Sequence, residues 1–163
     1  MLGVPAYGHS FNVSPSNASD SSGNLALNPG FTKNPPSNST DMCSNTEVVP
    51  DSKTFATLIT EGFLNNDGTP ASGVKHRFDD CSQTVSIDPF YGSIQFLTLF
   101  QPFVYDESKQ LMVSYDDPQS FAAKGKFIIQ NNLLGFAMWE STGDHNDLLL
   151  DAITAAAGVA DCL

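Results

Sequence analysis

The clearest hydrophobic patterns lie in the last third of the chain. From Pro118 to about Gln130, apolar residues recur at the three- and four-residue spacing of a helix. Asp117 directly before it is a favoured helix cap, and Asp116 is expected to support the end of the preceding strand rather than to take part in catalysis. The run Gly135–Trp139 is continuously apolar, which is typical of a buried strand in a parallel sheet.

A second helical pattern completes this region. Apolar residues return at helical spacing from Leu148 to about Ala157, and Gly158 marks the end of the helix. Asn146 or Asp147 is expected to cap the first turn, because either side chain can accept hydrogen bonds from free backbone N–H groups. The order helix, strand, loop, helix is typical of an α/β barrel or a layered α/β sheet.

The middle of the chain mixes helical and strand patterns. Lys53–Leu64 has a helical period, and Gly62 near its end is a stop signal. Three further segments have the composition of strands, namely Lys75–Phe78, Pro102–Tyr105 and Leu111–Tyr115. We therefore expect a small α+β unit in front of the α/β region.

The N-terminal part combines a strand with a long polar segment. Met1–Tyr7 is short and apolar, so we expect a strand that begins at the first residue. A signal peptide would need a basic start and a longer apolar run. A chain that opens inside such an element is expected to be a piece of a longer protein. Residues 10–45 are rich in Ser, Asn, Pro and Gly, the composition of a surface loop.

Composition narrows the classes of function. The 163 residues carry 18 Asp and Glu against 7 Lys and Arg, a net charge of −11, and 40% are hydrophobic. This apolar fraction can build a core, whereas the acidic balance argues against nucleic acid and anionic membranes as partners. No apolar run reaches the about 18 residues of a membrane span. Cys43, Cys81 and Cys162 fit neither a zinc nor a C-x-x-C spacing, so we expect no metal and no cofactor.

Three Asn-X-Ser/Thr sequons lie in the first quarter of the chain, at Asn12, Asn17 and Asn38. Pro15 follows the first sequon and weakens it, which leaves Asn17 and Asn38 as candidate glycosylation sites. Because N-glycans belong to secreted proteins, the sequons favour a secretory design.

Three segments resemble, in order and spacing, motifs of glycoside hydrolase family 18, the chitinases. Gly3–Phe11 resembles the seventh barrel strand of the family, and Val113–Ser120 resembles its entry into helix 7. Gly135–Glu140, followed by Gly143-Asp144, resembles the eighth strand and its loop. The likeness covers almost the whole chain and is greatest to secreted fungal chitinases, so it implies a secreted parent protein.

The resemblance implies an α/β fold that is the C-terminal quarter of a (β/α)₈ barrel. A complete barrel needs about 250 residues, more than this chain has. Residues 1–13 would be barrel strand 7, residues 14–111 an α+β chitinase insertion domain, and residues 112–163 helix 7, strand 8 and helix 8.

The family's chemistry is a substrate-assisted, retaining hydrolysis of β-1,4-linked N-acetylglucosamine. A Glu in the motif D-x-x-D-x-D-x-E protonates the leaving oxygen, and the acetamido group of the substrate attacks the anomeric carbon. This motif is absent from the sequence, so the chain has no catalytic residue of its own. The resemblance therefore implies a fragment of a chitinase acting on chitin or chitooligosaccharides, inactive alone. The alternative is a non-catalytic chitin-binding or chitooligosaccharide-binding protein.

The resemblance also implies the substrate-binding residues. Trp139 matches the tryptophan on which a sugar ring stacks, and the alternative is a core residue of a buried strand. Tyr7 matches a tyrosine that lines the cleft, or else packs inside the barrel. His9 stands where many members have an arginine, and a neutral histidine donates only one hydrogen bond. Glu140 is not the acid of the family, and Asp144 lacks the carboxylates of strand 4 as partners.

The same resemblance implies how the cysteines pair. Fungal relatives have cysteines at places similar to Cys43 and Cys81, which implies a disulfide between these two. Cys162 is expected to be unpaired.

The segment Val85–Gln101 interrupts the likeness. Relatives resemble the chain on both sides of this segment without containing it. Val85-Ser86 can be encoded with a splice donor, and the last codons can hold a branch site, a pyrimidine tract and a CAG acceptor. We hypothesise a translated, unspliced intron, and the alternative is a genuine surface loop or hairpin. Phe96–Phe100 is uncharged and β-prone, which favours aggregation.

Overall fold

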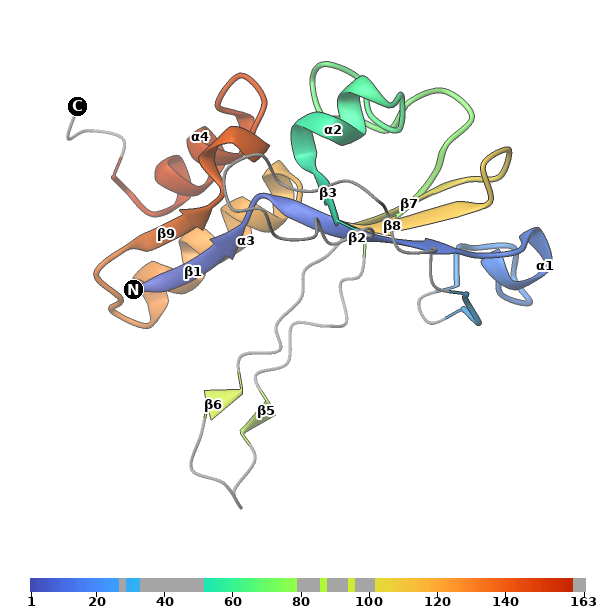
Figure 1. Cartoon of the computed structure of the whole chain (residues 1–163). Coiled ribbons are helices and arrows are strands. Elements are labelled where there is room, and N and C mark those ends of the chain that lie inside the picture. The colour runs from blue at the N-terminus through green and yellow to red at the C-terminus, as the bar shows by residue number, and fades with distance from the viewer. Residues whose placement is uncertain (27–28, 33–51, 79–85, 88–93, 96–101, 160–163) are drawn as a thin grey trace, which may run out of the picture.

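The computed structural model has two main sheets, which lie next to each other, and a separate two-stranded sheet (Figure 1). It describes all residues except 27–28, 33–51, 79–85, 88–93, 96–101 and 160–163. The strands are β1 Leu2–Pro5, β2 Tyr7–Asn12, β3 Ser52–Thr54, β4 Lys75–Phe78, β5 Ser86–Ile87, β6 Ile94–Gln95, β7 Pro102–Asp106, β8 Leu111–Ser114 and β9 Phe136–Trp139. The helices are α1 Pro15–Ala18, α2 Phe55–Thr60, α3 Pro118–Gln130 and α4 Leu148–Ala156, with a 3₁₀ turn at Ser141–Gly143.

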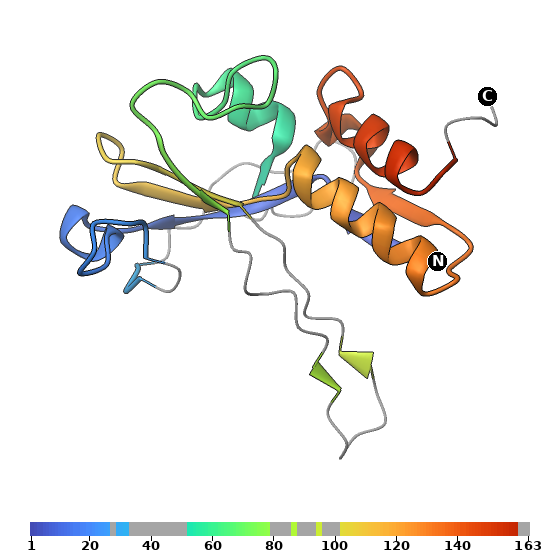
Figure 2. The same ribbon diagram turned by 180° about the vertical axis from the view of Figure 1, so that it is seen from behind.

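The first sheet is a parallel pair covered by two helices. β1 pairs with β9 in a register that sets Leu2 opposite Phe136 and Pro5 opposite Trp139. Helices α3 and α4 lie side by side next to this pair (Figure 2). Their buried side chains Phe121, Leu149 and Ile153 belong to the main hydrophobic core. A parallel strand pair joined through a helix confirms the α/β class.

β9 is not the fully buried strand that its composition predicts. Phe136 and Met138 pack against the core, whereas Ala137 and Trp139 point outward and Trp139 is 74% exposed. The prediction of burial is therefore wrong for the face that carries Ala137 and Trp139. In the described part of the chain, the core packs only against the face that carries Phe136 and Met138.

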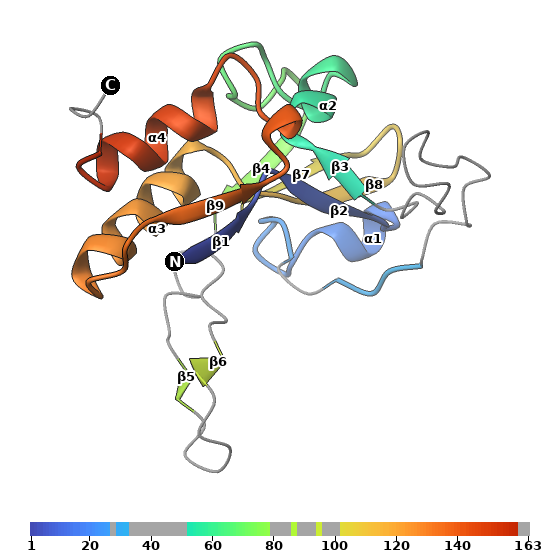
Figure 3. The ribbon, with the colours of Figure 1, turned by 60° about the vertical axis from the view of Figure 1, so that its left-hand side comes forward.

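The second sheet has five antiparallel strands in the order β3-β2-β8-β7-β4. Helix α2 covers one face, where Phe55 and Leu58 pack in the same core as Val104 and Val113. A smaller cluster that contains Tyr105 lies near α1 and the end of β2. β1 leads directly into β2, so one run of chain links the two sheets (Figure 3).

Helix α2 is shorter than the period of Lys53–Leu64 predicts. Ser52–Thr54 forms β3 against β2 instead, and the Thr54 side chain caps the helix by accepting a hydrogen bond from Thr57 N. The predicted stop is confirmed, since Gly62 adopts the left-handed φ of 78° just after the helix.

Helix α3 has the predicted bounds and cap. Asp117 Oδ1 accepts a hydrogen bond from Ser120 N at 2.8 Å, and Ser120 Oγ accepts one from Asp117 N at 2.9 Å. This reciprocal pair is a capping box that satisfies two backbone donors at the start of the helix.

Helix α4 is capped by a different residue from the two predicted. Asp147 occupies the N-cap position, but its side chain makes no capping hydrogen bond. Its backbone is left-handed, with φ of 58°, whereas N-cap residues are typically extended. Asp144 supplies the cap, because its two carboxylate oxygens accept hydrogen bonds from Leu149 N and Leu150 N, each at 3.0 Å.

Several sequence predictions lie outside the described residues. These are the Cys43–Cys81 disulfide, the unpaired Cys162 and the sequon at Asn38. Within Val85–Gln101 only β5 and β6 are described, and they pair with each other in a sheet of their own. The division into residues 1–13, 14–111 and 112–163 stays a prediction. No helix in the described ranges is long and apolar enough to cross a membrane.

Candidate functional site

An open pocket of about 290 Å³ lies where β2 and β3 meet the end of β9. It brings together all three residues predicted to bind sugar, although they are far apart in the sequence. Its lining residues are Tyr7, His9, Ser52, Thr54, Trp139 and Glu140.

The pairing of β2 with β3 places four of these side chains on one face of the sheet. Alternation along β2 sends Tyr7 and His9 to the same side. In the antiparallel register Thr54 is opposite Tyr7 and Ser52 is opposite His9. The rings of Tyr7 and His9 contact edge to face, with their centroids 5.8 Å apart and an angle of 89° between their planes.

Trp139 reaches the pocket from the other sheet. Its carbonyl oxygen accepts a hydrogen bond from Ala6 N at 2.8 Å, and the Ala6 oxygen accepts one from Phe55 N at 3.1 Å. Ala6 is 1% exposed, so one buried residue ties β9 and the start of α2 to the link between β1 and β2. The peptide bond between Trp139 and Glu140 is cis. The pairing of β1 with β9 and the hydrogen bond from Ala6 therefore place the backbone of Trp139 next to the start of β2.

The chemistry of the pocket combines a broad aromatic surface with polar groups at its edge. The indole of Trp139 is exposed, and His9 and Glu140 are exposed around it. The Thr54 hydroxyl accepts a hydrogen bond from Thr57 N at 3.0 Å and shares a second with Thr57 Oγ1 at 2.7 Å, so Ser52 and Tyr7 are the hydroxyl groups of the pocket best placed to bind a ligand. Such an arrangement suits a ligand with an apolar face and hydroxyl groups at its rim.

The other acidic candidates have structural roles. Asp144 binds the first turn of α4 through both oxygens. Asp116 is buried, and its Oδ1 lies 2.6 Å from Lys124 Nζ, an ion pair that joins the end of β8 to α3. Burial raises the pKa of Asp116, and the positive charge of Lys124 opposes that rise. These contacts agree with the prediction that Asp116 supports the strand end.

Sequence reasoning missed Ser52 and Thr54. Thr54 lies inside the helical pattern of Lys53–Leu64, and Ser52 directly precedes that pattern, so neither has a strand signal of its own. Only the long-range pairing with β2 brings them to the pocket. In the described ranges no group of three His, Cys, Asp or Glu residues could hold a metal ion.

The model of glycosyl hydrolases family 18 matches residues 1–144 of the chain. The chain belongs to glycosyl hydrolase family 18. The membership predicted from the three sequence motifs is therefore confirmed for this family 18 chain.

Two curated relatives match nearly all of the family 18 chain. It is 39% identical to a chitinase-like effector of Moniliophthora roreri over 97% of its length. It is 37% identical to a chitinase-like effector of Moniliophthora perniciosa over 98% of its length. The chain covers 37% and 34% of these proteins, so it spans about a third of their length.

Solved family 18 structures share the fold of the chain. A chitinase from Rhizomucor miehei matches with a TM-score of 0.63 and 21% identity, over 96% of this chain and 38% of that one. A class V chitinase from Nicotiana tobaccum matches with a TM-score of 0.61 and 20% identity, over 98% and 34%. A mutant of the tobacco enzyme in complex with NAG4 gives a TM-score of 0.60 at 20% identity, with the same coverage of 98% and 34%.

Proposed function

We propose that this chain binds chitin or chitooligosaccharides through the Trp139 pocket and does not hydrolyse them by itself. The observation that carries the proposal is Trp139, a large indole left 74% exposed and held by backbone pairing beside Tyr7 and His9. A pyranose ring presents an apolar C–H face that matches a flat aromatic surface of this size.

The polar rim of the pocket suits the rest of a sugar unit. With the ring stacked on Trp139, Tyr7 and Ser52 offer hydroxyl groups and Glu140 offers acceptor oxygens to the sugar hydroxyls. His9 offers one donor when neutral, fewer than the arginine common at this place in the family. The complex of a structural neighbour with NAG4 supports this ligand class.

Two observations argue against hydrolysis by this chain alone. The sequence does not contain D-x-x-D-x-D-x-E, the motif that provides the acid in family 18. Among the described lining residues Glu140 is the single carboxylate, and the next carboxylate along the chain, Asp144, is held by backbone N–H groups of α4.

We propose further that the α/β part is the C-terminal quarter of a (β/α)₈ barrel in a longer, secreted protein. In this proposal β1, α3, β9 and α4 are barrel strand 7, helix 7, strand 8 and helix 8. Residues 14–111 are the chitinase insertion domain, which contributes α2 and the strands β3, β4 and β7 of the five-stranded sheet. The parallel register of β1 and β9, with α3 between them in the chain, supports this arrangement.

Two activities are open to such a longer protein. Hydrolysis of chitin would require the family's catalytic motif in the rest of the chain. Non-catalytic capture of chitooligosaccharides is favoured by the two curated relatives, both named chitinase-like effectors.

The test of the proposal is a chitin pull-down of the chain and its Trp139→Ala variant. We expect chitin beads to retain the wild-type chain and the variant to bind about tenfold more weakly, the effect of losing about 1.4 kcal/mol. Leu134→Ala is the matched control, because Leu134 is 98% exposed and lies outside the pocket. Absence of retention by the wild type would reject the proposal.

A chitinase assay on the same preparations tests the second half of the proposal. We expect no turnover of chitooligosaccharides by the chain. Measurable turnover would overturn the non-catalytic assignment and direct attention to Glu140 or Asp144.

A further inference from the structure

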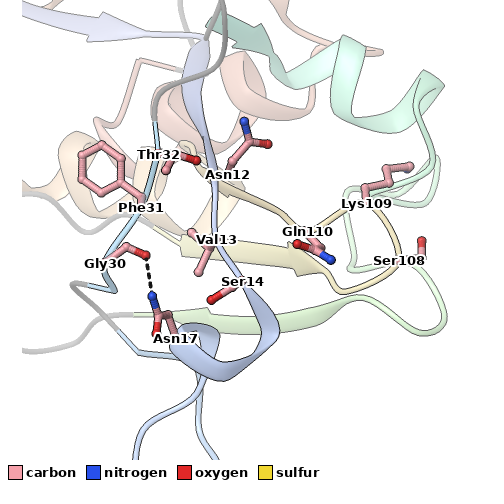
Figure 4. Close-up of a pocket in the computed structure, with 10 residues that line it drawn as sticks. All are labelled: Asn12, Val13, Ser14, Asn17, Gly30, Phe31, Thr32, Ser108, Lys109 and Gln110. Carbon is pink, nitrogen blue, oxygen red and sulfur yellow. Dashed lines mark hydrogen bonds between the residues drawn. The ribbon is translucent and has the colours of Figure 1, made fainter.

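A second pocket lies at the other end of β2 and combines a sequon with an exposed aromatic ring (Figure 4). It has a volume of about 650 Å³. Asn17 and Phe31 both line it, together with polar side chains that include Thr32 and Gln110. None of these residues belongs to the Trp139 pocket, so the second pocket needs an explanation of its own.

The side chain of Asn17 uses one of its amide hydrogens in a hydrogen bond within the described residues. Asn17 is exposed on α1, and its Nδ2 donates a hydrogen bond to the Gly30 oxygen at 3.3 Å. A primary amide has two N–H donors. Attachment of a sugar to Nδ2 replaces one hydrogen and leaves the other, so the contact with Gly30 is compatible with a glycan.

Phe31 is held in place from one side and open on the other. Its ring contacts the ring of Phe11 edge to face, with centroids 4.9 Å apart. The next residue, Thr32, exchanges two backbone hydrogen bonds with Asn12 of β2, at 3.1 and 2.9 Å. The ring remains 52% exposed, and Phe31 lines the same pocket as Asn17, with Gly30 between the two residues.

We propose that Asn17 carries an N-linked glycan whose first N-acetylglucosamine packs in this pocket against Phe31. The donor is a lipid-pyrophosphate-linked oligosaccharide. Nδ2 of Asn17 forms a bond to the anomeric carbon and gives up one proton to a base of the transferring enzyme. The bond from that carbon to the pyrophosphate oxygen breaks, and the lipid pyrophosphate leaves with the electron pair.

Asn12 provides an internal comparison, because its own sequon lines the same pocket. Pro15 directly follows that sequon and weakens it. Asn12 is also the last residue of β2, where its backbone pairs with Thr32 on one side and Leu111 on the other. We therefore assign the glycan to Asn17 and leave Asn12 unmodified.

Occupancy is tested by secreting the chain from a eukaryotic host behind an added leader and mapping its glycopeptides. We expect a glycan on the Asn17 peptide, lost in both Asn17→Gln and Ser19→Ala and kept in Asn12→Gln. Peptide mapping separates this glycan from any on Asn38. An unmodified Asn17 in the secreted wild type would overturn the proposal.

The packing of the first N-acetylglucosamine against Phe31 is tested with two deglycosylating enzymes. An endoglycosidase that leaves one N-acetylglucosamine is expected to preserve the melting temperature, whereas complete removal by an amidase lowers it by about 2–4 °C. The amidase also converts Asn17 to Asp, which loses the donor to the Gly30 oxygen, so Asn17→Asp without a glycan is the control for that change. In Phe31→Ala the difference between the two treated forms is expected to shrink to the loss caused by this conversion alone. An equal loss in wild type and Phe31→Ala would overturn the packing of the sugar against Phe31, and so would a wild-type loss no larger than that of the Asn17→Asp control.

Discussion

Asp106 illustrates how a single side chain organises a turn in this protein. It stands at the end of β7, where its Oδ1 accepts hydrogen bonds from Ser108 N at 3.0 Å and Ser108 Oγ at 2.6 Å. Lys109 Nζ lies 3.0 Å from the other carboxylate oxygen. The hydrogen bonds from Ser108, followed by those of Lys109, lower the pKa of Asp106 from 3.8 to about 2, although partial burial opposes them.

The lowered pKa predicts an acid-dependent loss of stability. The folded state binds this proton less readily than the unfolded state, so the stabilisation is complete above about pH 4 and is lost as the pH falls towards about 2. Asp106→Asn is expected to lower the free energy of unfolding at pH 7, with a difference from wild type that shrinks over that interval. Urea unfolding at several pH values measures it.

The exposed neighbour Glu107 is the control for this prediction. Glu107 pairs with Lys75 at 3.1 Å on the surface, and exposed pairs contribute little. Glu107→Gln should therefore leave the unfolding free energy nearly unchanged at pH 7. A constant difference between Asp106→Asn and wild type from pH 7 to pH 2 would contradict the assigned role of Asp106.

At the same scale, the sequence identified three of the six residues that line the Trp139 pocket as sugar-binding candidates. Trp139, Tyr7 and His9 lie in motifs that resemble a known family, and the structure brings all three to one pocket. Ser52 and Thr54 lie in no such motif, and their place depends on pairing with a strand more than forty residues earlier in the chain. Local patterns carry no information about that pairing.

Between elements, the contact of α3 with α4 depends on Gly125. A Cβ atom added at Gly125 would lie 2.6 Å from the Ile153 oxygen and 2.7 Å from the Ala156 Cβ. Both distances are far shorter than van der Waals contacts allow. The close approach of the two helices therefore requires the absence of a side chain at this position.

Gly125→Ala is expected to destabilise the protein although alanine favours helices. The gain in helix propensity is about 1 kcal/mol, whereas overpacking a close contact costs about 1–3 kcal/mol. Chemical denaturation should show a lower midpoint for Gly125→Ala. Lys126→Ala, on the exposed side of the same helix, should keep the denaturation midpoint of the wild type. A more stable Gly125→Ala would show that the helices separate easily.

The elements that sequence patterns predicted well are those fixed by local chemistry. The bounds and cap of α3 follow from Asp117 and the helical period after it. The misjudged features depend on distant neighbours. The first residues of the predicted α2 pair with β2, the cap of α4 comes from Asp144 in the preceding loop, and β9 has only one covered face in the described part.

For the whole molecule, the segment 85–101 is expected to be dispensable. Its described strands β5 and β6 form a separate sheet and pair with none of the five strands around them in the chain. A variant that joins Thr84 to Pro102 should keep the cooperative unfolding of the wild type and should be more soluble, because it lacks the apolar run Phe96–Phe100. Loss of cooperative unfolding would show that the segment is part of the fold.

A full-length transcript across the gene tests the origin of the same segment. The intron hypothesis predicts messages without these codons, and the proposal of a longer protein predicts coding sequence upstream of Met1. A message that begins at Met1 and keeps the codons would establish the loop or hairpin as a genuine part of the protein.

Residues 13–110 form a long excursion of the chain between β2 and β8, and its ends determine what a single proteolytic cut would do. The two strands pair directly, with Asn12 opposite Leu111, so the excursion begins and ends at neighbouring positions. The backbone of Trp139 and the β2 side of the Trp139 pocket are joined by the β1–β9 ladder and by Ala6, all outside the excursion. A protease that cut the excursion once would therefore produce two fragments that stay associated, with Trp139 still beside Tyr7.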